Sequence, residues 1–275
     1  MPASRNPIGG RYLLQEELGS GGMGVVWRAL DQELGRQVAL KQVNPSRIDV
    51  NRESLVERLR TEARAATLID HENVIQVHDQ FTDDDGVLWL VMEYVEGRSL
   101  DKVIAERPRD EPLPIPRVAV IGLGIIGGLE AAHKKKIIHR DLKPANVFLE
   151  ESGRVVVGDF GISLIEGGQR ITTAGRPMGT TPYMSPEQLS TPDQITVESD
   201  LWSLGATLYE AAEGESNPFW CPRACSFDLE RARHAGPMVP ILKKLLERDP
   251  ADRPDIPWIR DGLTELAQGT NPNGA

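Results

Sequence analysis

Cysteine and aromatic residues are both scarce in this sequence. Its 275 residues include two cysteines, Cys221 and Cys225, and 5% aromatic residues. Two cysteines cannot form a disulfide framework, so we expect a reducing, cytoplasmic environment. Their CPRAC spacing could supply half of a metal site, but such a site needs two further ligands nearby. Two ordinary thiols are therefore the favoured interpretation.

The sequence also lacks an excess of positive charge and a recognisable targeting segment. The net charge is −10, which argues against a nucleic-acid surface and against anchoring on acidic lipid. The one basic cluster, Lys134 to Lys136, is predicted to be the solvated end of a helix, where cations are favoured. The first ten residues have no apolar core of a signal peptide, and we expect no run long enough to insert in a membrane.

Strand patterns come first along the chain and helical patterns follow. Segments rich in Val and Leu predict strands at 12–18, 25–30 and 37–43, and a 3.6-residue apolar period predicts a helix over about 52–70. Two more strand candidates flank FTDDDG, which is interpreted as a hairpin loop rather than a calcium site. Helical periods follow at about 116–133, 199–213, 239–249 and 259–267. This order predicts an α+β fold with two lobes that join near 93–97.

A glycine-rich stretch separates the first two predicted strands. It consists of Gly19, Ser20, Gly21, Gly22, Met23 and Gly24. Glycine lets backbone amides approach phosphate oxygens with no side chain in the way. Alone, the stretch is equally consistent with an ordinary glycine-rich hairpin turn.

Lys41 and Glu62 form a candidate ion pair. Lys41 lies among apolar residues of the third predicted strand, where an unpaired charge would be costly. Glu62 falls in register with the apolar stripe of the helix that follows. The alternative is a solvated glutamate at the rim, but the rarity of unpaired buried charges favours the pair.

The segment VAVIGLGIIGG at 118–128 contains G-x-G-x-x-G, with Gly122, Gly124 and Gly127. This is the fingerprint of a dinucleotide-binding fold, and Asp141 even lies near the offset expected for a ribose contact. However, the fingerprint lies in mid-chain, the crossover helix would be very short, and Asp141 belongs to a stronger motif. A buried helix that contains glycines is the favoured interpretation.

The stretch HRDLKPANV at 139–147 places an acid, a base and an amide in one polar loop between apolar segments. Phosphoryl transfer needs a carboxylate for the hydroxyl proton, a cation for developing charge and oxygen ligands for magnesium. Asp159 follows an apolar strand and precedes Phe160 and Gly161, and a carboxylate at a strand end suits magnesium.

These motifs together resemble the protein kinases, over nearly the whole chain from Tyr12 to about Ala267. GSGGMGVV, VALK, Glu62, HRDLKPANV, DFG and SPE at 185–187 follow one another in the family's order. The resemblance implies a bilobal fold, an N-lobe sheet with one regulatory helix, and a mainly α-helical C-lobe. It places an N-terminal extension at 1–11, the kinase domain at 12–268 (N-lobe 12–95, C-lobe 96–268) and a polar tail at 269–275.

The resemblance also implies roles for individual residues. Lys41 would hold the α- and β-phosphates of ATP and pair with Glu62, while Asp141 would be the catalytic base and Lys143 would face the γ-phosphate. Asn146 and Asp159 would bind Mg²⁺ or Mn²⁺. The glycine-rich residues 19–24 would cover the phosphates, and adenine would be bound by Leu18, Val26, Ala39, Phe148, the gatekeeper Met92, and the backbone of Glu93 and Val95.

Further residues indicate which branch of the family the chain resembles. Lys143 is characteristic of serine/threonine kinases, and Thr180 matches the threonine that steadies the catalytic aspartate and lysine. The residues of the segments GGMGVVW and HRDLKPANV resemble those of the bacterial branch. Asp200 and the pair Glu187–Arg253 match structural anchors of the family, which would otherwise be interpreted as a helix N-cap and a stabilising salt bridge.

The segment 162–184 is predicted to be the activation loop. By the resemblance, Arg140 would bind a phosphate there, so we expect autophosphorylation at Thr172 or Thr173, for which a homodimer could serve. The alternative is that both threonines are ordinary loop residues. The family's further helix looks abbreviated between Pro218 and Pro240, which leaves docking of protein substrates open.

Two other functional hypotheses compete with an active kinase. A pseudokinase scaffold would bind nucleotide without transferring phosphate, but Lys41, Asp141, Asn146 and Asp159 are all present. A nicotinamide-dependent oxidoreductase built on Gly122 to Gly127 is the third hypothesis, and we expect no binding of that cofactor.

Overall fold

A computed structural model of the chain describes residues 7–21, 24–43, 57, 60–61, 64–108, 110–160, 181–190, 195–214, 220–221 and 226–269. The chain divides into two compact units. The N-terminal unit comprises Met1–Asp70 and Ile75–Glu96, and the C-terminal unit comprises His71–Val74 and Gly97–Ala275. These two units are the lobes of the predicted α+β fold.

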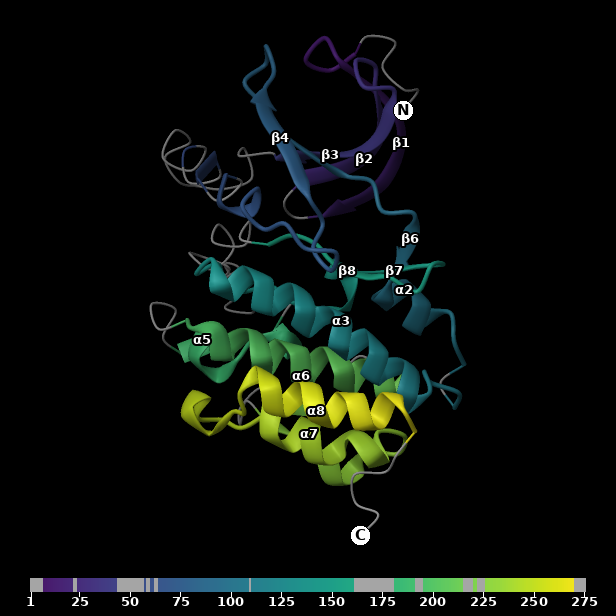
Figure 1. Cartoon of the computed structure of the whole chain (residues 1–275), viewed down its shortest axis with the longest axis vertical. Coiled ribbons are helices and arrows are strands. Elements are labelled where there is room, and N and C mark those ends of the chain that lie inside the picture. Colours follow the sequence, from purple (N-terminus) through teal and green to yellow (C-terminus); the bar gives the residue numbers. More distant parts are fainter. Residues whose placement is uncertain are drawn as a thin grey trace. The chain divides into compact units, whose positions relative to one another are not determined.

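The N-terminal unit is built on a five-stranded antiparallel sheet in the order β1-β2-β3-β5-β4 (Figure 1). Its strands are β1 (Tyr12–Gly21), β2 (Gly24–Asp31), β3 (Arg36–Val43), β4 (Val77–Thr82) and β5 (Leu88–Glu93). All five match strands expected from the sequence. Of the helix expected over 52–70, the structure describes residues 57, 60–61 and 64–66 as helical, followed by buried Ile69.

One face of this sheet carries the apolar core of the unit. Alternate residues of each strand point to the same face, so Val38 and Leu40 lie together with Trp89 and Val91 in a buried cluster. The N-terminal residues add to it, because Ile8 packs against the same cluster. Arg11 donates two hydrogen bonds of 2.7 Å to the fully buried carboxylate of Asp31, one from Nε and one from Nη2.

The loop between β4 and β5 is a hairpin loop, as predicted. The Asp83 carboxylate accepts hydrogen bonds from the backbone N–H of Asp85 at 3.1 Å and of Val87 at 2.8 Å. It also accepts one from Trp89 Nε1 at 2.7 Å. These bonds occupy the carboxylate in a structural role.

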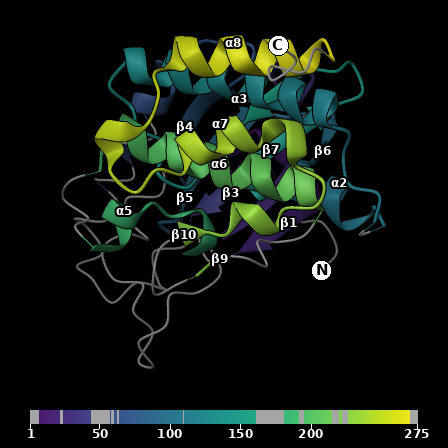
Figure 2. The same cartoon turned by 90° about the horizontal axis from the view of Figure 1, so that it is seen from below.

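The C-terminal unit is mainly helical (Figure 1). Its helices are α2 (Leu100–Ala105), α3 (Ile115–Lys134), α5 (Pro186–Ser190), α6 (Val197–Glu213), α7 (Val239–Leu245) and α8 (Ile256–Ala267). Figure 2 shows the same helices from below, with α8 along α3 and α7 beside α6. Every residue of α6 from Ser199 to Glu213 is buried, so this helix forms the centre of the unit.

Short strands complete the unit. The strands β6 (Gly97–Ser99), β7 (Val147–Glu150) and β8 (Val155–Val157) form a small antiparallel sheet, and β9 (Trp220–Cys221) pairs with β10 (Ser226–Phe227). Only turns of 3-10 helix, at Leu229–Arg231 and Gly236–Met238, follow β10 before α7. Among the described residues from β9 to Met238, just before α7, no α-helix occurs, which agrees with the abbreviation expected there.

The glycines of the apparent dinucleotide fingerprint lie inside α3, as the favoured interpretation predicts. Each allows a close approach: a Cβ at Gly122 would meet Leu263 at 2.8 Å, and one at Gly124 would meet Val155 Cβ at 2.6 Å. By length and composition α3 could cross a membrane, so the expectation that no run is long enough is wrong. Half of that apolar stretch is buried, and α3 packs against α6 and α8 as a core helix does.

Residues His71–Val74 belong to the C-terminal unit although they interrupt the N-terminal one in sequence. Val74 forms a parallel bridge with Val157, and the Val157 N–H donates to the Asn73 carbonyl at 2.9 Å. Asn73 Nδ2 in turn donates to the Val155 carbonyl at 2.7 Å. Strand β8 is therefore held in place by this short segment.

Candidate active site

The loop that carries HRDLKPANV is anchored to α6 by a single carboxylate. Asp200 Oδ2 accepts a hydrogen bond from the His139 N–H at 2.9 Å, and Oδ1 accepts one from the Arg140 N–H at 2.8 Å. His133 of α3 places its Nε2 2.7 Å from Asp200 Oδ2. Because Asp200 is fully buried on the central helix, the loop backbone is fixed to the most enclosed part of the unit.

The two residues before Asp141 have unusual environments. His139 is fully buried, its Nε2 lies 2.8 Å from the Gly158 carbonyl oxygen, and its Nδ1 accepts the Asp141 N–H at 3.3 Å. Arg140 has φ of 68°, a left-handed conformation that non-glycine residues adopt only where surrounding contacts enforce it. The backbone therefore turns sharply just before the candidate base.

Asp141, Lys143 and Asn146, which the sequence places in one polar loop, lie close together. Lys143 Nζ lies 2.7 Å from Asp141 Oδ2, and the same oxygen accepts a longer bond of 3.3 Å from Asn146 Nδ2. Asn146 Nδ2 also donates to the Asp141 carbonyl at 2.8 Å. The Asp141 carboxylate is thus oriented by a cation and an amide while its residue stays 8% exposed.

Asp159 follows β8 and lies between Gly158 and Phe160, which both contact the loop that carries HRDLKPANV. Its φ is 61°, a left-handed conformation that it shares with Arg140 and Lys136 among the described non-glycine residues. The Gly158 N–H just before it donates to the Asn146 carbonyl at 2.8 Å, and the ring of Phe160 lies 4.5 Å from the ring of His139. Asp159 is therefore tied through both neighbours to the residues that frame Asp141.

The predicted adenine and phosphate residues of the N-terminal unit share one face of its sheet. The strand register pairs Val26 with Lys41 and Ala39 with Met92, and directly paired residues point to the same side. This face is opposite to the one that carries Val38 and Leu40. Lys41 is 4% exposed, so the sheet does bury a cation as predicted.

The glycine-rich stretch is the end of the β1–β2 hairpin. Register pairs run from Gly19 with Val26 to Gly21 with Gly24, and Ser20 lies between them. Gly24 has φ of 139°, and a Cβ there would meet the Gln42 carbonyl oxygen at 1.7 Å, so only glycine fits. Leu18 is half-buried in β1, while Glu93 ends β5 and Val95 follows it.

The remaining predicted site residues lie either in the C-terminal unit or outside the described part of the chain. Phe148 is half-buried in β7 of the C-terminal unit. Six predicted site residues lie outside the described part of the chain: Gly22, Met23, Glu62, Thr172, Thr173 and Thr180. The predicted pair between Lys41 and Glu62 stays a prediction.

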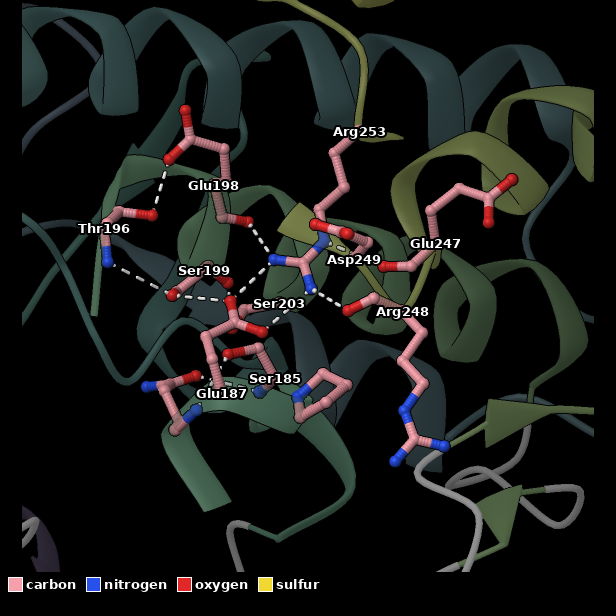
Figure 3. Close-up of polar contacts among 12 residues, drawn as sticks. Ser185, Glu187, Thr196, Glu198, Ser199, Ser203, Glu247, Arg248, Asp249 and Arg253 are labelled. Carbon is pink, nitrogen blue, oxygen red and sulfur yellow. Dashed lines mark hydrogen bonds and ion pairs between the residues drawn. The ribbon is translucent and has the colours of Figure 1, made fainter. Parts of the chain in front are cut away.

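The anchors around α5 are confirmed in the structure (Figure 3). Arg253 donates to both carboxylate oxygens of Glu187, at 2.6 and 2.9 Å, and Ser199 Oγ donates to Glu187 Oε1 at 2.7 Å. Burial raises the pKa of Glu187, but the hydrogen bonds from Arg253 and Ser199 outweigh it and leave the pKa below the ordinary value. The N-cap of α6 is Thr196, so the alternative role of Asp200 as an N-cap is wrong.

Sequence reasoning missed several polar contacts of α6. Ser203 Oγ donates to the Tyr183 carbonyl at 2.8 Å, and the Tyr183 hydroxyl donates to Glu210 Oε2. Burial raises the pKa of Glu210, and it also raises the pKa of Tyr183. Glu213 accepts three backbone N–H bonds from residues 233–235. The sequence offered one signal for these contacts: Ser203, Glu210 and Glu213 are hydroxyl or acidic residues within an otherwise apolar helical period.

Comparison with known proteins supports the assignment of the site. The protein kinase domain family model matches residues 12–261. Serine/threonine-protein kinase PknA of Mycobacterium tuberculosis is 35% identical over 270 residues, which cover 96% of this chain and 58% of that protein. A probable serine/threonine-protein kinase of Streptomyces coelicolor is 40% identical over 209 residues, which cover 74% of this chain and 30% of that protein.

The fold comparison agrees. The crystal structure of the Mycobacterium tuberculosis PknI kinase domain superposes with a TM-score of 0.74 at 27% identity, and it covers 97% of this chain and 100% of that one. The chain belongs to the protein kinase family, as a bacterial serine/threonine kinase domain of the eukaryotic type. It spans between about one third and two thirds of the length of the curated relatives it matches.

Proposed function

We propose that this chain is an active kinase that transfers the γ-phosphate of ATP to serine and threonine hydroxyls of proteins, with Asp141 as the catalytic base. The observation that carries the proposal is the orientation of the Asp141 carboxylate by Lys143 and Asn146 on a loop held by Asp200. A carboxylate fixed in this way can accept the proton of an incoming hydroxyl without first reorganising.

Asn146 and Asp159 are the proposed ligands of Mg²⁺. The Asn146 nitrogen is committed to Asp141, and within the part of the chain that the structure describes its side-chain oxygen has no hydrogen bond. Amide and carboxylate oxygens fit a hard divalent cation, which neutralises charge on the phosphates when bound. No cluster of three or more His, Cys, Asp or Glu side chains occurs among the described residues, so phosphate oxygens would complete the coordination.

The N-terminal unit is proposed to bind the rest of ATP. Lys41 would hold the α- and β-phosphates with Glu62 as its partner, and the backbone of 19–24 would cover the phosphates. The shared sheet face of Val26, Ala39 and Met92 supports a flat apolar surface for adenine. Leu18 and Phe148 would add to this surface, and the backbone of Glu93 and Val95 would bind the adenine edge.

Arg140 supports the proposed regulation through the activation loop. Its buried Nε atom has no hydrogen-bond partner among the residues that the structure describes. A buried guanidinium nitrogen without a partner is costly, and a phosphate on Thr172 or Thr173 would satisfy it. Thr180 would steady Asp141 and Lys143, and a transient homodimer would allow one copy to phosphorylate the other.

A pseudokinase scaffold is the second candidate function. It would need the same nucleotide site without transfer of phosphate. The ordered carboxylate of Asp141 beside Lys143 favours the active kinase, because a scaffold has no use for an oriented base.

The decisive test is the comparison of the chain with its Asp141→Asn variant, given ATP, Mg²⁺ and a generic basic protein. Loss of the base is expected to lower the transfer rate about a thousandfold. Asp261→Asn makes the same chemical change at an exposed carboxylate of α8 and should keep the full rate. Equal transfer by the chain and the Asp141→Asn variant would refute the assignment of the base.

The regulatory proposal has its own test. After incubation with ATP and Mg²⁺, peptide mapping is expected to find phosphate on Thr172 or Thr173. An Arg140→Met variant should gain no activity from that phosphate. A map with neither threonine modified would remove this part of the proposal and leave the transfer chemistry untouched.

A further inference from the structure

Gln188 closes a reciprocal pair of hydrogen bonds at the start of α5. The Ser185 N–H donates to Gln188 Oε1 at 2.9 Å, and the Gln188 N–H donates to Ser185 Oγ at 3.3 Å. This is the geometry of a capping box, in which glutamine and glutamate serve equally well because only the side-chain oxygen is used. The amide nitrogen of Gln188 is therefore not needed for the helix.

That nitrogen donates to the catalytic loop. Gln188 Nε2 lies 2.8 Å from the carbonyl oxygen of Arg140. The orientation of the amide is settled by its two partners, since the oxygen faces a backbone donor and the nitrogen faces a backbone acceptor. A flipped amide would lose both bonds.

The Arg140 carbonyl belongs to the peptide that precedes the base. Arg140 has φ of 68°, and its own N–H is held by Asp200 at 2.8 Å. The next N–H, that of Asp141, is held by His139 Nδ1 at 3.3 Å. Gln188 supplies the remaining bond, so the carbonyl and the N–H of the Arg140–Asp141 peptide are both fixed. A left-handed residue persists only where such bonds hold it.

We infer that Gln188 is a positioning residue for the phosphoryl transfer. It connects the segment that starts α5 to the backbone turn that aims Asp141, and it does so through a donor that the capping box leaves unused. The inference rests on the proposed function, because it assigns Gln188 to the reaction for which Asp141 is the base. Gln188 is half-buried, so water can only partly replace its bond to Arg140.

The matched variant is Gln188→Glu. The new side chain keeps the oxygen that accepts from the Ser185 N–H, but when ionised it has no donor for the Arg140 carbonyl. Single-turnover transfer at pH 8 is expected to fall about ten- to a hundredfold, with an unchanged KM for ATP. Protonation of the introduced carboxyl restores an O–H donor, so the ratio of variant rate to wild-type rate should rise as the pH is lowered towards 5, nearer the ordinary carboxyl pKa of about 4.3.

Two further variants separate positioning from a general loss of stability. Gln188→Met keeps the length without charge or donor, so its rate should fall at pH 8 and show no recovery at lower pH. Ser185→Ala removes the acceptor for the Gln188 N–H and leaves Nε2 in place, so it should lower the melting temperature while the rate stays within about twofold. Amide hydrogen exchange of residues 139–142 should accelerate in both Gln188 variants and not in Ser185→Ala.

The outcomes that overturn the inference are distinct from those that overturn the proposed function. Wild-type rates in both Gln188 variants at pH 8, or rates that fall in parallel with melting temperature in all three variants, would refute positioning by Gln188. If the wild-type chain itself transfers no phosphate, the proposed function fails. Hydrogen exchange then still decides whether Gln188 holds the loop.

Discussion

At the scale of single residues, two buried glutamates respond to their surroundings in opposite ways. The pKa of Glu187 lies below its ordinary value because Arg253 and Ser199 donate to the carboxylate, which outweighs burial. The pKa of Glu210 lies above its ordinary value because burial outweighs the hydrogen bond from the Tyr183 hydroxyl, which lowers it. Both carboxylates hold the segment 183–187. Glu187 does so through its ion pair with Arg253, and Glu210 through its hydrogen bond with the Tyr183 hydroxyl.

Removal of the Glu187 side chain should be strongly destabilising. In Glu187→Ala the Arg253 guanidinium stays buried without its carboxylate, and loss of one partner of a buried pair costs about 3–5 kcal/mol. Glu130→Ala removes a carboxylate whose pairs with Lys134 and Arg260 are partly exposed, so it should cost less than about 1 kcal/mol. Urea unfolding of both variants measures the difference, and equal costs would contradict the structural role of the pair.

The two carboxylates should also give opposite pH dependence of stability. The lowered pKa of Glu187 means that its contribution is present above the unfolded value of about 4.3 and is lost as the pH falls through the folded value. The raised pKa of Glu210 means that its contribution is present below the unfolded value and is lost as the pH rises through the folded value. Glu210→Gln should therefore gain stability relative to wild type between pH 4 and 8, as followed by urea unfolding. A constant difference in the free energy of unfolding between Glu210→Gln and wild type over that range would count against the raised pKa of Glu210.

At the residue scale, the sequence can predict which side chains lie close together only where they cluster in a short motif. Asp141, Lys143 and Asn146 lie within six positions, so a loop that contains them must bring them close. Tyr183 and Glu210 are 27 residues apart, and no spacing rule connects them. Gln188 was missed for a related reason, because its partner is the backbone of Arg140, which carries no sequence signal.

At the scale of elements, α3 shows how a motif can be present without its function. Its G-x-G-x-x-G glycines and Gly128 lie in a continuous helix and not at a strand-to-helix turn. A Cβ at Gly128 would meet the Asn73 backbone oxygen at 2.8 Å, whereas one at Gly122 would meet the end of the Leu263 side chain at the same distance. The glycines thus serve packing, and their neighbours differ in how far they can move.

The loss of stability caused by alanine substitutions in α3 should depend on how far the neighbour of each glycine can move. Alanine gains about 1 kcal/mol of helix propensity over glycine, while overpacking costs about 1–3 kcal/mol. Gly128→Ala should be the most destabilising because backbone cannot move away, Gly124→Ala should follow, and Gly122→Ala should be nearly neutral. Val120→Ala, at an exposed position of the same helix, is the control and should change stability little. Thermal unfolding that shows equal effects at all three glycines would argue against this packing.

At the scale of the whole molecule, the order of strands and helices was enough to predict a two-lobed α+β chain. Segments rich in Val and Leu predicted the strands of the five-stranded sheet, and the 3.6-residue period predicted α3, α6, α7 and α8. The short helices α2 and α5 were not expected. The contribution of residues before Tyr12 had no such signal, because Ile8 and Arg11 belong to no helical or strand period in the sequence. The family match and the predicted kinase domain both begin at Tyr12.

Truncation tests where the folded N-terminal unit begins. A chain that starts at Pro7 should unfold like the full chain, since it keeps Ile8 and Arg11. A chain that starts at Tyr12 leaves the Asp31 carboxylate, whose pKa the Arg11 hydrogen bonds hold near 2, buried without its partner. It should unfold at a lower urea concentration than the chain that starts at Pro7. Equal stability of the two chains would mean that the N-terminal contacts contribute nothing.

The membership of His71–Val74 in the C-terminal unit has a consequence for recombining kinase lobes. The polypeptide passes between the units three times, after Asp70, after Val74 and after Glu96. An exchange of N-terminal halves at 96 alone would import a foreign tetrapeptide against β8 and discard the bonds of Asn73 to Val155 and Val157. Chimeric kinases built from this chain should therefore be spliced at all three junctions, with 71–74 inherited from the parent that supplies β8.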